Sequence, residues 1–186
     1  MANLVRMRTA RWVAALAAAV LAVVLSACVP TPAPTPTTTG FASEEEAFAA
    51  AEATYRAYVD ALNDVDLSDP ATFEPLYTLT TGDANEAARV TFSQMHADGW
   101  VVEGPTVLAL LERATSPSLS ESARLAVCVD VSEVEVVDST GTSVVAVDRK
   151  DVQPMLITLE PSWAADHGWL IKRIEGRDGS PECSSG

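Results

Sequence analysis

The chain has 186 residues and a formal net charge of −14 at pH 7, from 26 acidic and 12 basic side chains. A surface this acidic repels phosphate backbones and anionic headgroups, so the composition argues against nucleic-acid binding. The sequence also lacks the motifs H-E-x-x-H, C-x-x-C and G-x-S-x-G, a phosphate loop and a dinucleotide fingerprint, so we expect no metal and no cofactor.

The first segment in chain order is expected to be a lipoprotein signal peptide, residues 1–27. Three arginines and no acid precede an unbroken apolar run, Trp12 to Leu25, which is of secretory length and too short for a comfortable membrane span. The next residues, Leu25-Ser26-Ala27-Cys28, resemble the bacterial lipobox. The resemblance implies cleavage before Cys28, a diacylglycerol thioether on its sulfur and often acylation of the new amino group. An ordinary signal peptide with an incidental cysteine, or an uncut anchor, is the alternative.

Residues 28–40 are expected to form a stalk that follows the lipidated cysteine. Prolines at positions 30, 32, 34 and 36 alternate with small residues, mostly threonine, and such a run cannot build a core. A polyproline-like segment rises ~3.1 Å per residue, so this spacer would be roughly 35–40 Å long. O-glycosylation of its threonines is a further hypothesis. Residues 41–186 are then expected to form one domain.

The domain is expected to open with a helix that ends near Asn63-Asp64. Ser43 and Glu46 match a capping box, and acids fill the first turn, where the helix dipole favours negative charge. Apolar side chains then recur on one helical stripe. The stripe consists of Phe48, Ala51, Tyr55, Tyr58, Val59 and Leu62.

Two more helices are expected before residue 100. Asp69 followed by Pro70 predicts the start of a short helix, with Phe73, Leu76 and Tyr77 inward. Asp83 is expected to cap a third helix, and Gly99 to follow its end. The buried face of this third helix is expected to hold Ala84, Ala88, Phe92 and Met95.

From Trp100 onward the pattern predicts strands. Residues 100–111 are apolar and β-branched around a bulge or bend at Gly104-Pro105. Residues 123–137 give the clearest strand, with Leu125, Val127, Val129 and Val131 on one face and a bend after Ser132. A hairpin turn is expected at residues 138–141, and further strands at 144–147, 152–159 and 169–174. Three helices followed by hairpin-linked strands predict an α+β fold with an antiparallel sheet.

Two segments carry a resemblance to a known fold, and together they span roughly residues 43–176. They are the opening helix EEEAFAAAEATYRAYVDALND and the closing strand pair VQPMLITLEPSWAADHGWLIKRIEG. This order resembles the NTF2-like (SnoaL-like) family, and the layout is similar to that of secreted actinobacterial lipoproteins. The resemblance implies a cone in which a curved sheet wraps the first helix and leaves a cavity at its mouth. The family includes isomerases, dehydratases and members without chemistry, so the fold does not decide the function.

The cysteines that remain after Cys28 are expected to form a disulfide. Cys128 and Cys183 are an even pair in an exported chain, where oxidation is permitted. The bridge would close a loop of about 55 residues and stabilise the fold by ~4 kcal/mol in the chain-entropy model. Two unpaired thiols are the alternative.

Four residues are weak candidates for catalysis on this fold. Tyr55 and Tyr58 lie on the apolar stripe of the first helix, His96 at the edge of the third, and Asp130 on the clearest strand. Inside a cone, burial could tune the pKa values of such groups. The structural interpretation of each residue is simpler: core tyrosines, a boundary histidine and an exposed or hydrogen-bonded aspartate. The acidic run 64–69 lacks the glycine and glutamate of an EF-hand loop and is interpreted as a solvated loop.

The sequence therefore supports two function hypotheses. The first is a membrane-anchored, extracytoplasmic lipoprotein with a non-catalytic domain that binds a small apolar ligand or a protein partner. The second is an isomerase or dehydratase that uses a polar cavity. Convergence of two candidate residues in one pocket would favour the enzyme. A homodimer that pairs through the sheet is a third possibility.

Overall fold

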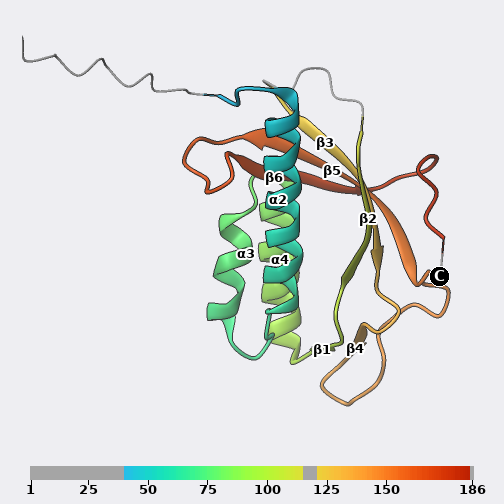
Figure 1. Cartoon of the computed structure of the whole chain (residues 1–186). Coiled ribbons are helices and arrows are strands. Elements are labelled where there is room, and N and C mark those ends of the chain that lie inside the picture. Colours follow the sequence, from blue (N-terminus) through green and yellow to red (C-terminus); the bar gives the residue numbers. More distant parts are fainter. Residues whose placement is uncertain (1–39, 115–120, 185–186) are drawn as a thin grey trace, which may run out of the picture. The chain divides into compact units, whose positions relative to one another are not determined.

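The computed structural model describes residues 40–114 and 121–184. The expected leader, Cys28 and most of the expected stalk lie outside these ranges. Helical segments come first and antiparallel strands follow (Figure 1). No helix in the described ranges is both long enough and apolar enough to cross a membrane.

Helix α2 spans Glu44–Asn63, as the sequence predicts. The Ser43 side chain accepts a hydrogen bond from the Glu46 N–H, and the Glu46 carboxylate accepts one from the Ala42 N–H at 2.7 Å. These two bonds satisfy one backbone donor in the first helical turn and one just before the N-cap, much as a capping box does. The apolar stripe of α2 then faces the sheet.

The second helical segment is irregular, as expected. A 3₁₀ turn, η1 (Pro70–Phe73), leads directly into the one-turn helix α3 (Glu74–Thr78). The Asp69 side chain accepts from the Ala71 N–H and so caps η1. Proline at the start of each piece explains the break, since proline has no N–H to continue a helical ladder.

Helix α4 spans Gly82–Asp98, and the predicted cap at Asp83 is wrong. The N-cap is Thr81, whose N–H donates to the Ile171 carbonyl on the neighbouring strand. This backbone bond fixes the residue before the helix, so the helix starts earlier than predicted and Asp83 falls in its first turn. The predicted end is confirmed, since Gly99 closes the helix with φ of 68°.

The main sheet has four antiparallel strands in the order β2-β3-β5-β6. They are β2 (Val107–Arg113), β3 (Ala123–Asp130), β5 (Val152–Pro161) and β6 (Trp169–Gly176). The helices lie on one side of this curved sheet, with α2 against it (Figure 1). The predicted α+β fold class, with N-terminal helices packed on a curved antiparallel sheet, is confirmed by this architecture.

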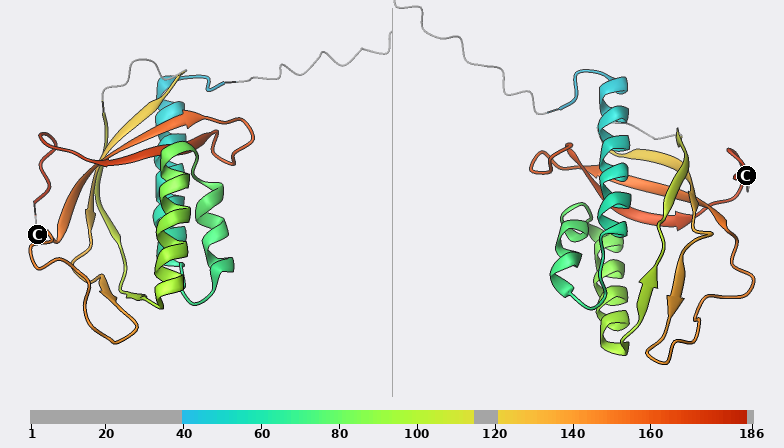
Figure 2. Two further views of the ribbon diagram at one scale, coloured as in Figure 1. Left: turned by 180° about the vertical axis from the view of Figure 1, so that it is seen from behind. Right: turned by 60° about the horizontal axis from the view of Figure 1, so that its bottom comes forward.

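A separate two-stranded sheet lies beside the C-terminal ends of α2 and α4 (Figure 2). Strand β1 (Val101–Glu103) pairs antiparallel with β4 (Glu135–Val137). The expected bends separate these strands from β2 and β3. Gly104 makes the first bend with φ of 84°, and a Cβ there would collide with the Glu133 carbonyl, so only glycine fits. We call β1, β4 and the loop 138–151 the arm.

The strand predicted at residues 144–147 is wrong. The expected hairpin turn forms after Val137, but pairing then stops after one bridge, between Val137 and Ser143. The Arg149 guanidinium donates instead to the carbonyls of Val131 and Val134, at 2.9 and 2.8 Å. The loop is thus closed by a side chain rather than by a strand ladder.

The core lies between α2 and the inner face of the sheet. Its fully buried side chains include Trp169, Leu125, Ile157, Leu159, Ile171 and Val127. The Trp169 indole N–H donates to the Ala47 carbonyl at 3.0 Å, which joins β6 to α2. Phe41 stacks on Trp169 at 5.3 Å between ring centroids and contacts Trp163 at 5.2 Å. We call these three rings the aromatic clasp.

Cys128 and Cys183 form a disulfide, as predicted. The bond holds the segment after β6 against β3. Arg177 strengthens this attachment, because its guanidinium contacts both sulfur atoms and donates to the Met155 and Gly179 carbonyls. The C-terminal segment is therefore held by covalent and polar contacts together.

Candidate functional site

Tyr55 and Tyr58 are the only two of the four candidate residues that the structure brings together. Their rings stack with centroids 5.9 Å apart, and Tyr55 is only 3% exposed. No described residue hydrogen-bonds to either hydroxyl group. Burial raises the pKa of Tyr58 to about 12 and that of Tyr55 further, with the neighbouring phenol adding to the shift in Tyr55. Both are therefore neutral at physiological pH and act as core residues.

These shifts predict a loss of stability in alkaline solution. Above pH ~10 the unfolded chain releases its phenolic protons while the folded chain retains them, so the free energy of unfolding falls as pH rises toward 12. The Tyr55→Phe/Tyr58→Phe double variant should show a weaker fall between these pH values, measured by urea unfolding. Equal pH dependence in parent and variant would contradict the assignment.

His96 and Asp130 occupy two other environments. The His96 Nδ1–H donates to the Leu67 carbonyl at 2.6 Å, and the ring meets Phe73 edge-on. The Asp130 carboxylate accepts from the Ser132 N–H at 2.9 Å, and its hydrogen bonds to Ser132 lower its pKa. No described contact joins His96 or Asp130 to the tyrosines or to each other. The convergence that would favour the enzyme hypothesis is thus not found among the described residues.

No group of His, Cys, Asp and Glu with the geometry of a metal site occurs in residues 40–114 and 121–184. In the acidic run 64–69, Asp66 accepts from the N–H and hydroxyl of Ser68, and Asp69 caps η1. These carboxylates stabilise local turns, as in many solvated loops.

A groove of about 490 Å³, lined mostly by apolar residues, lies at the C-terminal end of α2. We call it the apolar groove. It is formed by the end of α2 and the loop after it, the last turns of α4, and the bend between β1 and β2. Its lining residues are Leu62, Asn63, Val65, Leu67, Phe92, Met95, Val102, Gly104, Pro105, Thr106 and Val134.

The polar groups in the wall of the apolar groove are paired with each other. The Asn63 amide nitrogen donates to the Thr106 carbonyl at 3.0 Å, and the Thr106 N–H donates to the Asn63 amide oxygen at 2.8 Å. This pair fixes the bend between β1 and β2 against α2. The groove therefore offers an apolar surface and no charged side chain. Sequence reasoning missed it, although the Gly104-Pro105 bend that shapes it was visible.

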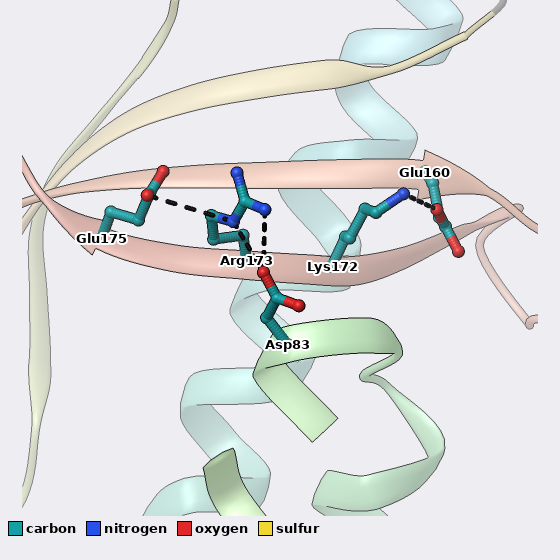
Figure 3. Close-up of polar contacts among 5 residues, drawn as sticks. All are labelled: Asp83, Glu160, Lys172, Arg173 and Glu175. Carbon is teal, nitrogen blue, oxygen red and sulfur yellow. Dashed lines mark hydrogen bonds and ion pairs between the residues drawn. The ribbon is translucent and has the colours of Figure 1, made fainter. Parts of the chain in front are cut away.

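A second group of polar residues joins α4 to the edge strand β6 (Figure 3). The Arg173 guanidinium donates twice to the Asp83 carboxylate, at 3.0 and 2.8 Å, and lies 4.0 Å from Glu175. Lys172 pairs with Glu160 at 2.8 Å. All five side chains are at least one-third exposed, so solvent screens these pairs and each contributes little to stability. We interpret the Asp83–Arg173 pair as a contact that holds α4 on the sheet, and the Lys172–Glu160 pair as a contact between β6 and β5.

A cleft of about 370 Å³ opens beside this ion pair. Tyr58, Phe92 and Ile174 form its apolar part, and Asp83 and Arg173 lie at its polar side. Sequence reasoning did not single out Asp83 and Arg173 as partners, because ninety positions separate them in the chain.

Comparison with known proteins gives structural likeness only. No family profile matches the chain, and no curated protein matches it. The solved structures that are similar to it include the following three, each at low identity. The first is a candidate aromatic ring hydroxylase from Novosphingobium aromaticivorans, with 14% identity over 72% of this chain and 89% of that chain and a TM-score of 0.45. The second is CagV, a VirB8 homologue of the type IV secretion system from Helicobacter pylori, with 11% identity over 70% of this chain and 99% of that chain and a TM-score of 0.43. The third is a periplasmic fragment of TraM, with 14% identity over 75% of this chain and 100% of that chain and a TM-score of 0.40. Likeness at this level assigns neither a family nor an activity.

Proposed function

We propose that this protein is an extracytoplasmic lipoprotein, anchored through Cys28, whose domain binds a small apolar ligand in the apolar groove. The leader and the lipobox-like residues before Cys28 support the anchor. A disulfide between Cys128 and Cys183 supports an oxidising compartment, since such bonds are rare in the cytosol.

The observation that carries the ligand proposal is the apolar groove itself. Its volume of about 490 Å³ lies within the usual range for sites that bind small molecules. Its lining has no charged side chain, and the hydrogen bonds between Asn63 and Thr106 already satisfy its polar wall. A charged or strongly hydrated ligand would lose its water there without compensation, so the groove favours a neutral apolar molecule.

The same lining supports binding rather than acid–base chemistry. General acid–base catalysis needs a titratable group within hydrogen-bond reach of the substrate. None of the residues that line the apolar groove is an acid, a histidine, a lysine or a tyrosine. The proposed role is therefore a binding module presented on the outer side of the membrane.

Binding of a neutral fluorescent probe, N-phenyl-1-naphthylamine, tests the proposal. We expect saturable binding to the full-length protein and at least about tenfold weaker binding to Met95→Lys, because the substitution places a charge in the wall of the groove. Val90→Lys is the matched control, since Val90 lies on the same helix but is 65% exposed and should leave binding unchanged. Circular dichroism would verify that both variants fold.

Equal probe binding by Met95→Lys and the parent would refute the ligand proposal. The Cys28→Ala variant tests the lipid anchor independently of the ligand proposal. This variant should move from the detergent phase to the aqueous phase while its probe binding remains. A detergent-phase Cys28→Ala protein without an acyl-dependent mass shift would refute the anchor alone.

A further inference from the structure

Exposed valines are concentrated at the arm. Seven large apolar side chains are exposed in the described part of the chain. Four of them, Val101, Val102, Val144 and Val147, belong to the arm, and a fifth, Val107, starts the strand that follows it. Val147 is fully exposed, at 106%. A local concentration of apolar surface of this kind marks an interaction site more often than scattered single residues do.

The outer edge of β1 is open. Within the described ranges β1 pairs only with β4, and all three of its residues are exposed. The other side of β4 is partly occupied, because the Val144 N–H donates to the Val136 carbonyl. A two-stranded ribbon is marginally stable in water, and an open edge is a template for a further strand.

The charges on the arm lack a cationic partner. Glu103 lies directly opposite Glu135 across the two strands, an arrangement of like charges that destabilises a ribbon. None of the five ion pairs between described residues includes an arm residue. Arg149 and Lys150 also lie in the arm, but the Arg149 guanidinium binds backbone carbonyls and no ion pair between described residues includes Lys150. One face of the ribbon therefore carries uncompensated negative charge.

We propose that the edge of β1 binds an extended polypeptide segment in which basic and apolar side chains alternate. The segment would add to β1 as a third strand through main-chain hydrogen bonds. Successive side chains of a strand point to opposite faces, so its basic residues would lie beside Glu103 while its apolar residues lie beside Val102. Glu135 is one strand further on the same face as Glu103 and adds to the negative charge there. A second copy of this chain is disfavoured, since it would bring the same acids to this edge. This activity is additional to ligand binding in the apolar groove.

Three synthetic heptapeptides test the proposal by calorimetry with the full-length protein. The first alternates lysine and valine, the second alternates glutamate and valine, and the third is the lysine peptide with alternate amides N-methylated to block strand pairing. We expect binding of the first only, weakened at least about tenfold between about 50 and 500 mM NaCl because exposed charges are screened. The Glu103→Gln/Glu135→Gln variant should weaken it by about tenfold as well.

Glu45→Gln/Glu86→Gln is the matched control, because it removes two exposed acids that lie on helices α2 and α4 rather than on the arm, and it should leave peptide affinity unchanged. Absence of binding by the lysine peptide, or equal binding of the lysine and glutamate peptides, would overturn the proposal. So would equal affinity of the N-methylated peptide. Because Val102 also lines the apolar groove, probe binding is measured on the same protein variants without peptide, and its retention or loss reports separately on the ligand proposal.

Discussion

Replacement of both Cys128 and Cys183 by alanine is expected to lower the free energy of unfolding by about 4 kcal/mol. The bridge joins residues 55 positions apart, so its removal returns a large amount of conformational freedom to the unfolded chain. The buried position of Cys128 adds to the effect, because the alanine is smaller than the half-cystine it replaces. Urea unfolding of the parent and the double variant measures the difference.

The same experiment with a reducing agent provides the control for side-chain volume. Reduction of the parent should reproduce most of the loss, whereas the double variant should be insensitive to the agent. A parent protein whose unfolding midpoint is the same with and without reductant would contradict the stabilising role of the bridge.

Trp169→Ala is expected to lower the free energy of unfolding by about 3–5 kcal/mol. Trp169 is 0% exposed, and its indole N–H donates to the Ala47 carbonyl, which would lose this donor inside the core. Phe41 would lose its stacking partner as well. Thermal and urea unfolding of the variant would show a lower midpoint, or a protein that does not fold at 37 °C.

Trp163→Ala is the matched control for this variant. Trp163 belongs to the same aromatic clasp and contacts the same Phe41 ring, but it is 52% exposed. Its loss should cost about 1 kcal/mol, as expected for an exposed aromatic contact. Comparable destabilisation by the two substitutions would show that the core contacts of Trp169 are not decisive.

Local signals in the sequence predicted the parts of the fold that depend on near neighbours. The capping box at Ser43 and the stripe of α2 lie within one helix, so 3.6-residue periodicity was sufficient to predict both. The start of α4 depends on a backbone bond from Thr81 to Ile171, ninety residues away, and no local pattern contains it. The strand predicted at 144–147 also failed because of contacts outside the segment. The Arg149 side chain binds the carbonyls of Val131 and Val134, and these bonds replace the expected strand ladder.

The candidate site was predicted less well than the fold. The cysteine pair could be inferred from parity and compartment, which need no geometry. The apolar groove could not be inferred, because its wall combines Leu62, Met95 and Val102 from three separate elements. Tyrosines on an apolar stripe favoured a core role over a catalytic one, and the stacking of Tyr55 on Tyr58 and the burial of Tyr55 agree with that interpretation.

The aromatic clasp determines where mechanical load reaches the domain. Phe41 precedes α2, whereas Asn63 at the wall of the apolar groove ends it, and twenty helical residues span about 30 Å. A pull on the polypeptide before Phe41 would therefore reach Trp163 and Trp169 first, about one helix length from the apolar groove.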